Sequence, residues 1–345
     1  MTADTTIVPA TSGSAGTSAQ PVLVARDLAK AYAGRWALRS LSFSLSAGRV
    51  LGFLGPNGAG KTTSIRILTT VLEPTSGDFV VDGVSSSQPE QIRRRIGVLP
   101  EGLGFPRAIS AIDYLKYYGQ LFGRPAREAA DVGFALLRQV GLESRTGSLI
   151  GTFSHGMRQR LGIARALVND PRVVFLDEPT LGLDPRGQAE LLALIQDLAR
   201  SRGVGVVLSS HLLSEIERIC DDVVIMNAGR IVATGTVADV VGRASEGGAR
   251  ARSIRIKVPP ASTEQAAHAL EGTSDVAVVA VVDRAGGWLS VEMAELGGSS
   301  TDGDGLARNR VLDALISAEV PILAVEQTAA RLQDVFLELT AETIQ

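Results

Sequence analysis

Several features are scarce in this chain of 345 residues, and each scarcity narrows the class of protein. It contains a single cysteine, Cys220, so no disulfide can form within the chain, which fits a reducing compartment. Aromatic residues make up only 4% of the chain. No apolar run approaches the roughly 20 residues that a helix needs to span a bilayer, which argues against a transmembrane helix. The net charge of −3, from 34 basic and 37 acidic residues, lacks the positive excess with which proteins bind nucleic acids through bulk charge. We therefore expect a globular protein with no membrane span of its own and no nucleic-acid partner.

Composition divides the chain into four segments. Residues 1–20 are rich in Ser, Thr, Ala and Gly but lack the basic start and apolar centre of a signal peptide, so we expect a disordered leader. A composition shift within 243–252, rich in Gly and Arg, predicts a linker. This linker separates a large domain over 21–242 from a small domain over 253–345.

Hydrophobic periodicity predicts the fold of the large domain. Leu41, Phe43 and Leu45 alternate with other residues, which indicates a β-rich beginning, whereas residues 87–168 are expected to be mostly helical. From residue 173 to residue 226, short apolar strands alternate with helices. Such alternation predicts a parallel sheet that is covered on both faces.

One expected helix of the large domain contains three of the chain's four tyrosines, and a capping box opens it. Leu115, Tyr118 and Phe122 share the spacing of a core-facing stripe, and Tyr114 and Tyr117 lie off it. Packing accounts for these tyrosines. The alternative is an exposed aromatic surface that binds a partner.

The small domain shows a different order of elements, namely strand, helix, strand, strand, helix, strand. This order matches an α+β ferredoxin-like unit, and no residue pattern in it points to chemistry. The expected elements are strand Ile254–Val258, a helix from Ser262, strands Val276–Val282 and Trp288–Val291, a Gly-rich loop over Leu296–Gly305, helix Leu306–Ala318, strand Ile322–Val325 and a last helix over Arg331–Ala341.

A glycine-rich segment follows the short apolar strand Val50–Leu54. Residues Gly55–Thr62 match the phosphate-binding pattern G-x-x-x-x-G-K-[ST], in which glycines let backbone N–H groups approach phosphate oxygens. The helix that follows points its positive end at the same phosphates. Lys61, one of only four lysines, supplies charge to the β and γ phosphates, and Thr62 offers a hydroxyl to Mg²⁺. The predicted nucleotide-binding residues here are Gly55, Pro56, Asn57, Gly58, Ala59, Gly60, Lys61, Thr62 and Thr63.

Two adjacent carboxylates, Asp177 and Glu178, end the apolar strand that begins at Val173. Successive residues of a strand point to opposite sides, so Asp177 can reach Mg²⁺ while Glu178 faces an attacking water as general base. Many strands end in Asp, so the pair alone is a weak signal. After a phosphate-binding loop, it predicts nucleotide hydrolysis.

The order of these motifs resembles the nucleotide-binding subunit of ATP-binding cassette (ABC) transporters. Phe153–Gln159 resembles the signature motif of that family, and His211 resembles its switch histidine. Leu183 and Asp184 resemble the loop that follows the second carboxylate. Tyr32 resembles the aromatic residue that stacks on adenine, although a strand-edge tyrosine has other uses. The resemblance covers nearly all of the large domain.

The resemblance implies a fold, a reaction and partners. The fold class is α/β, with a P-loop NTPase cassette over 21–242 that combines a β-rich subdomain, a parallel-sheet core and a helical subdomain. The reaction is Mg²⁺-dependent ATP hydrolysis, with Glu178 and His211 as catalytic residues. Two cassettes, expected to be two copies of this chain, hold two ATP molecules between them. They drive a separate integral-membrane subunit from the cytoplasmic side of the cell membrane.

Ser154 and Gly156 are the signature residues expected to bind nucleotide. Ser154 is a natural N-cap, and in the family this helix end binds the γ-phosphate in the site of a second subunit. Two residues depart from the family pattern: His155 stands where glycine is usual, and Glu101 where glutamine is most often found. A glutamate only accepts hydrogen bonds, but it can still hold Mg²⁺ or its water. The predicted metal ligands are Thr62, Asp177 and Glu101.

Both departures, together with the closing stretch Leu332–Thr340, resemble the subgroup of exporters that handle drugs, antibiotics or lipids. The alternative function is a soluble ABC ATPase of translation or DNA repair that has no membrane partner. Such proteins usually have two cassettes in tandem or a long coiled coil, whereas this chain has one P-loop and no heptad run. A regulatory module that never hydrolyses ATP would need neither Glu178 nor His211.

Overall fold

The computed structural model describes most of the chain. The described residues are 21–102, 104–247, 253–273, 276–293, 301–327, 332–333 and 335–336. The expected leader, the second half of the expected linker and most of the expected last helix lie outside these ranges. None of the helices within them combines the length and the apolar character of a membrane span.

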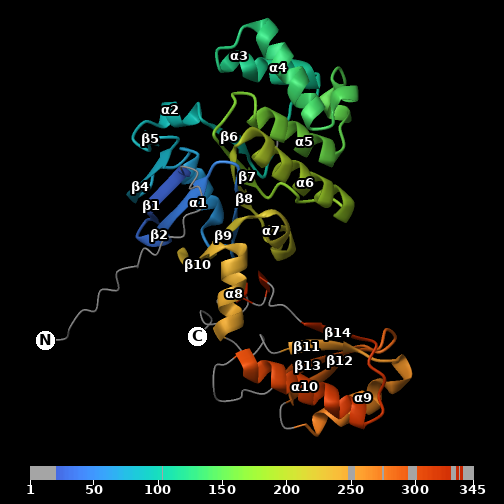
Figure 1. The fold of residues 1–345 in the computed structure, drawn as a ribbon. Coiled ribbons are helices and arrows are strands. Elements are labelled where there is room, and N and C mark those ends of the chain that lie inside the picture. The colour runs from blue at the N-terminus through green and yellow to red at the C-terminus, as the bar shows by residue number, and fades with distance from the viewer. Residues whose placement is uncertain are drawn as a thin grey trace, which may run out of the picture. The chain divides into compact units, whose positions relative to one another are not determined.

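The chain divides into two compact units, whose elements are labelled in Figure 1. The first unit contains the residues up to Phe53, together with 57–210 and 228–230. The second unit contains residues 54–56, 211–227 and those from Ile231 onward.

The first unit begins with antiparallel strands. The strand β1 (Pro21–Tyr32) pairs with β2 (Arg35–Ser46) and with β4 (Ser76–Val81), and β4 pairs with β5 (Val84–Ser85). Along β2 from Leu41 to Leu45, buried residues alternate with exposed ones. The predicted β-rich beginning of the large domain is confirmed.

Four strands, which belong to the first unit except for the last residue of β3, run parallel to one another. In order across the sheet they are β3 (Val50–Leu54), β8 (Gly205–Ser209), β7 (Val173–Asp177) and β6 (Ile96–Leu99). Every residue of β3, β7 and β8 is buried, as expected for a sheet covered on both faces. The prediction of a mostly helical region over 87–168 missed β6. A run of four apolar residues is too short for its period to distinguish strand from helix.

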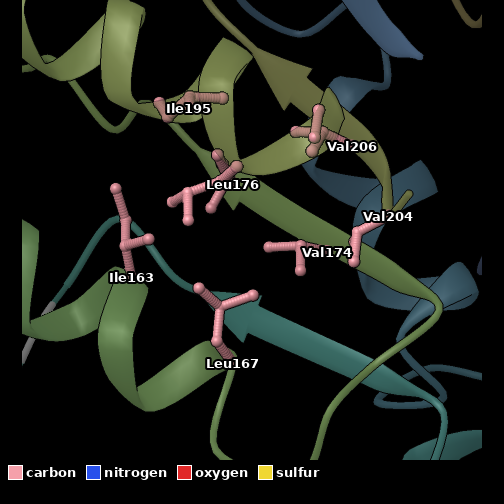
Figure 2. Close-up of a pocket in the computed structure, with 9 residues that line it drawn as sticks. Ile163, Leu167, Val174, Leu176, Ile195, Val204 and Val206 are labelled. Atoms are coloured by element: carbon pink, nitrogen blue, oxygen red, sulfur yellow. The ribbon is translucent and has the colours of Figure 1, made fainter. Parts of the chain in front are cut away.

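Helices α5 (His155–Ala166) and α6 (Pro185–Arg202) pack with β7 and β8 around a small apolar cavity of about 10 Å³ (Figure 2). Figure 2 shows side chains from the α5 and α6 segments pointing toward those of the two strands. The cavity is lined by Ile163, Leu167, Val174, Leu176, Ile195, Leu198, Ala199, Val204 and Val206. Because Leu176 directly precedes Asp177, this packing fixes the strand that presents the two carboxylates.

The chain between β6 and β7 is largely helical. Its elements are α3 (Ala111–Leu121), α4 (Ala126–Gln139), 3-10 turns at Glu143–Arg145 and Ile150–Thr152, and α5; the short α2 (Pro89–Arg93) precedes β6. The hydroxyl of Ser110 accepts a hydrogen bond from the Asp113 N–H at 3.2 Å, so the predicted cap of α3 is confirmed.

Two predicted positions on α3 are wrong. Phe122, expected in the core, is 44% exposed, whereas Tyr114, expected off the core stripe, is only 4% exposed. The Tyr114 ring packs edge-on against Phe105 at 5.3 Å, and its hydroxyl accepts a hydrogen bond from Arg165 at 3.3 Å. These partners lie far along the chain or outside the helix, so the local period of α3 could not reveal them.

The second unit contains two groups of elements. The first group is α7 (Leu213–Ile219), β9 (Asp222–Asn227), β10 (Arg230–Thr236, whose first residue belongs to the first unit) and α8 (Val237–Gly247). Because α8 ends at Gly247, the first half of the expected linker is helical.

The second group forms a four-stranded antiparallel sheet with two helices. Its elements are β11 (Ser253–Lys257), a 3-10 turn at Pro260–Ser262, α9 (Thr263–Glu271), β12 (Val276–Asp283), β13 (Trp288–Met293), α10 (Thr301–Ser317) and β14 (Ala324–Gln327). The strands lie in the order β12-β13-β11-β14. The order of elements along the chain is the predicted one, and the ferredoxin-like assignment stays a prediction. The loop expected up to Gly305 is wrong from Thr301 on, since α10 begins there.

Candidate functional site

The predicted phosphate-binding loop connects β3 to helix α1 (Lys61–Leu68). Gly58 and Gly60 have φ angles of 82° and 107°, in the left-handed region. A Cβ added at Gly58 would meet no atom within 4 Å, so backbone conformation rather than space requires glycine there. Gly60 is the N-cap of α1, and its carbonyl accepts the N–H of Ser64 at 2.9 Å. The N–H groups of a first helical turn point along the helix axis away from the helix, which suits an anion at this helix end.

Lys61 is a buried cation beside two carboxylates. The residue is 9% exposed, and burial lowers the pKa of its ammonium group from 10.5, while the charges of Glu178 and Asp177 act to raise it. Burying an ammonium group is costly unless negative charge lies nearby. The structure thus brings together the three charged residues that the sequence predicts for the phosphate and metal site.

Asp177 is fixed by the neighbouring strand. One of its carboxylate oxygens accepts a hydrogen bond from the Ser209 hydroxyl at 2.5 Å, and the two residues are direct partners in the register of β7 and β8. Ser209 is fully buried. It was not among the predicted site residues. Its signal in the sequence is a polar residue at the carboxyl end of an apolar strand.

Glu178 has a backbone conformation that L-residues rarely adopt. Its φ of 49° lies in the left-handed region, which costs about 1–2 kcal/mol for a residue with a Cβ. Its N–H donates to Ser209 at two acceptors, the carbonyl at 3.2 Å and the hydroxyl at 3.1 Å. A strained residue that its neighbours hold in place is typical of functional sites.

Glu101 and His211 each follow the end of a parallel strand. Glu101 is exposed and lies two residues beyond β6, which pairs with β7, so it leaves the sheet at the same edge as Asp177. His211 is exposed and follows Ser210, which itself follows β8. Parallel strands present their carboxyl ends at one edge, the usual place for ligands in such sheets. The roles of Glu101 and His211 stay predictions.

Tyr32 is the last residue of β1 and is 45% exposed. Its ring centroid lies 5.5 Å from the ammonium group of Lys30. An exposed ring at a strand end can receive a flat base, and it can equally serve only this cation–π contact. The adenine contact stays a prediction.

The predicted signature motif lies at the start of α5, and α6 likewise begins with a side-chain cap. The Ser154 hydroxyl accepts the N–H of Met157 at 3.2 Å, so the predicted N-cap is confirmed. Asp184 caps α6 in the same way, accepting the N–H of Gly187 at 3.2 Å. Both capping residues are exposed.

The signature turn packs against the loop that follows Glu178. The ring atom Nε2 of His155 lies 2.8 Å from the carbonyl oxygen of Leu181. A Cβ added at Gly156 would lie 3.5 Å from a methyl carbon of Leu183. Two groups of predicted residues are therefore visible in the first unit. Lys61, Asp177 and Glu178 form the first, and the signature turn with the loop 181–184 forms the second.

Comparisons with known proteins agree with these observations. Residues 38–181 match the model of the ABC transporter family. Over 212 residues, 61% of this chain and 68% of the relative, the chain is 41% identical to the bacitracin transport ATP-binding protein BcrA of Bacillus licheniformis. Over 64% of this chain and 71% of the relative, it is 34% identical to the linearmycin resistance ATP-binding protein LnrL of Bacillus subtilis.

A solved structure described as the ATP-binding subunit of an ABC transporter shares the fold. It is 32% identical to this chain, covers 64% of it with 92% of its own length, and superposes with a TM-score of 0.58. A dimeric bacterial ABC transporter cassette also has this fold, with a TM-score of 0.56 over 62% of this chain and 98% of its own, at 23% identity. The predicted fold of the large domain is confirmed.

Proposed function

This chain belongs to the family of ABC transporter ATP-binding proteins, and from that premise we propose that it powers export of an antibiotic-like compound or a lipid through a separate membrane subunit. As a member of this family it binds ATP and is an ATPase. Relatives named for bacitracin transport and linearmycin resistance support the choice of exported compounds. The departures at His155 and Glu101 support the same subgroup.

The meeting of Lys61 with Asp177 and Glu178 is the observation that supports the ATPase mechanism best. A buried ammonium group, a helix end and two carboxylates lie together at the carboxyl edge of a parallel sheet. The helix end and the ammonium group attract phosphate oxygens, whereas the carboxylates repel them. A divalent cation held by the carboxylates would offset this conflict of charge.

The residues present fit magnesium-bound ATP. The hydroxyl of Thr62 and the carboxylates of Asp177 and Glu101 are oxygen donors of the kind that Mg²⁺ prefers. When bound, Mg²⁺ neutralises the charge that develops on the β and γ phosphates. Within the described ranges, no group of three or more His, Cys, Asp or Glu side chains could hold a metal. Phosphates and water would then supply the remaining ligands, as is usual for Mg²⁺ at nucleotides.

Each catalytic step is assigned to residues of the chain itself. Lys61 and the N–H groups at the start of α1 bind the β and γ phosphates. Glu178 orients the attacking water and accepts its proton. Ser209 holds Asp177 and the Glu178 N–H, which limits the movement of both carboxylates. His211 donates a hydrogen bond to the transferred phosphoryl group.

We assign the second half of each site to another copy of the chain. The exposed, capped start of α5 at Ser154 presents N–H groups and a positive helix end to an anion outside its own chain. Closure of two copies would place this helix end on the γ-phosphate bound by the partner subunit. Closing and reopening then moves the membrane subunit on the cytoplasmic side of the membrane.

Two measurements on the full-length chain test the proposed function. The first is Mg²⁺-dependent release of phosphate from ATP, which we expect to be measurable. The second is co-purification with an integral-membrane protein encoded beside it, after mild detergent extraction. ATPase activity without any membrane partner would favour the soluble alternative. Failure to retain ATP at millimolar ATP and Mg²⁺ would contradict the mechanism itself.

A further inference from the structure

His155 makes a contact for which the proposed function gives no reason. The residue is exposed, yet its Nε2 lies 2.8 Å from the carbonyl oxygen of Leu181 in the loop after Glu178. A carbonyl oxygen only accepts hydrogen bonds, so Nε2 carries the proton in this contact. Glycine, the residue usual in the family at this position, has no side chain with which to make it.

The loop that receives this hydrogen bond is itself tied to Glu178. The N–H of Leu181 donates to the Glu178 carbonyl at 3.2 Å, and the N–H of Leu183 donates to the Thr180 carbonyl at 3.1 Å. Gly182 has a φ of 77° between them. Two hydrogen bonds across so few residues form a compact turn. The backbone of Leu181 is therefore hydrogen-bonded directly to that of Glu178.

The fit between the two segments extends beyond one hydrogen bond. A Cβ added at Gly182 would lie 3.4 Å from Nε2 of His155, which is van der Waals contact. Gly182 has a φ that residues with side chains rarely adopt, so backbone conformation favours glycine there. The imidazole thus lies directly over the turn at Leu181 and Gly182.

We propose that His155 is a positioning residue that anchors the turn after Glu178 to the signature helix of the same chain. This inference rests on the proposed function, in which Ser154 binds the partner's ATP while Glu178 acts on the ATP of its own chain. The contact then couples the two tasks. When α5 engages the nucleotide of the partner subunit, the carboxylate of its own chain is held in place for hydrolysis.

Two substitutions with opposite expectations test the inference. His155→Leu fills similar space but donates no hydrogen bond, and it should lower kcat about 3- to 10-fold, the range that one hydrogen bond supports, with the KM for ATP nearly unchanged. His155→Gln places a donor N–H near the position of Nε2 and should restore most of kcat. His268→Leu is the matched control, because His268 is exposed in the other unit and should leave both constants unchanged.

Mixed dimers, purified through two affinity tags, test whether His155 acts on the base of its own chain. In both mixtures one copy contains Glu178→Gln, so only the other copy retains a base. The rate should be about 3- to 10-fold lower when His155→Leu is in the copy with the intact base than when it is in the inactive copy. Equal rates in the two mixtures would overturn the inference.

Amide hydrogen exchange supplies a readout that needs no activity. In nucleotide-free protein, the amides of residues 181–184 should exchange several-fold faster in His155→Leu than in wild type, and His155→Gln should match wild type. Unchanged kcat in His155→Leu beside an active wild type, or equal losses in both variants, overturns the positioning role alone. An inactive wild type instead contradicts the proposed function and the coupling with it.

Discussion

Two sheets in this chain differ in the kind of residue that they bury. At the carboxyl ends of β7 and β8, Asp177 and Ser209 are buried polar residues, Lys61 lies buried beside the carboxylates, and Glu178 has a left-handed backbone. The sheet of β11 to β14 instead packs a buried core of apolar residues that includes Ile256, Leu289 and Val291. Its cations Arg255 and Lys257 lie over the ring of Trp288, at 4.7 Å and 5.5 Å from the centroid.

This difference shows where chemistry is to be sought. The apolar core of the β11–β14 sheet needs no function to explain its residues. The edge around Lys61 instead combines a buried ammonium group, buried polar side chains and a left-handed backbone at Glu178, and each of these is costly unless a ligand or a fixed neighbour offsets it. The following predictions test whether substitutions at the edge around Lys61 affect catalysis while substitutions in the β11–β14 sheet do not.

The largest effect is expected from Glu178→Gln. Loss of the general base should lower turnover about 10²- to 10⁴-fold, because the amide cannot accept the proton of water. The affinity for ATP should change little, since the phosphate contacts remain. Phosphate release and nucleotide binding, measured on the same preparation, check both expectations. Full hydrolysis by this variant would remove Glu178 from the mechanism.

A matched pair of lysine substitutions compares the two sheets directly. Lys61→Ala removes a charged donor to phosphate and should weaken ATP binding about 10- to 100-fold. Lys257→Ala removes an equal charge beside Trp288 and should leave ATP binding unchanged. Titration with a fluorescent ATP analogue measures both. Equal affinities in the two variants would mean that the phosphate-binding loop is assigned wrongly.

Ser209→Ala should have an intermediate effect. It removes the 2.5 Å hydrogen bond to Asp177 and one acceptor of the Glu178 N–H, so a buried carboxylate loses its partner. Such a loss costs about 1–3 kcal/mol, and we expect roughly tenfold slower turnover and a thermal midpoint lower by several degrees. Ser290→Ala in β13 is the control, and neither quantity should change there.

The smallest effect is expected from Glu101→Gln. The amide restores the side chain that is usual in the family, and its carbonyl oxygen can still face Mg²⁺ or its water. Turnover should change by only about two- to threefold, with a shift in the Mg²⁺ concentration at half-maximal rate, because a charged ligand has been replaced by a neutral one. A loss as large as that of Glu178→Gln would give Glu101 a direct catalytic role.

The sequence predicted the site best where its residues are neighbours in the chain. The glycines around Lys61 and the strand that ends in Asp177 and Glu178 are local patterns, because the backbone of one loop or one strand suffices to place them. The caps at Ser110 and Ser154 were equally visible, since a cap needs only the first turn of its own helix.

The residues whose roles or burial the sequence did not predict have contact partners that lie far away in the chain. Ser209 contacts Asp177 because β8 lies beside β7 in a register that pairs the two residues. No local sequence pattern fixes such a register. Tyr114 is buried through Phe105 and Arg165. The role of His155 likewise needed Leu181, 26 residues away, before it could be considered.

The left-handed backbone of Glu178 has a consequence for the variation that this position can accept. Beta-branched residues are disfavoured in that conformation, whereas Asn and Asp tolerate it better than most. A complete mutational scan should therefore find Glu178→Val and Glu178→Ile poorly expressed, and Glu178→Asn well folded but inactive. Residue 178 is therefore under two constraints: it must adopt a left-handed backbone conformation, and it must supply the carboxylate of the general base.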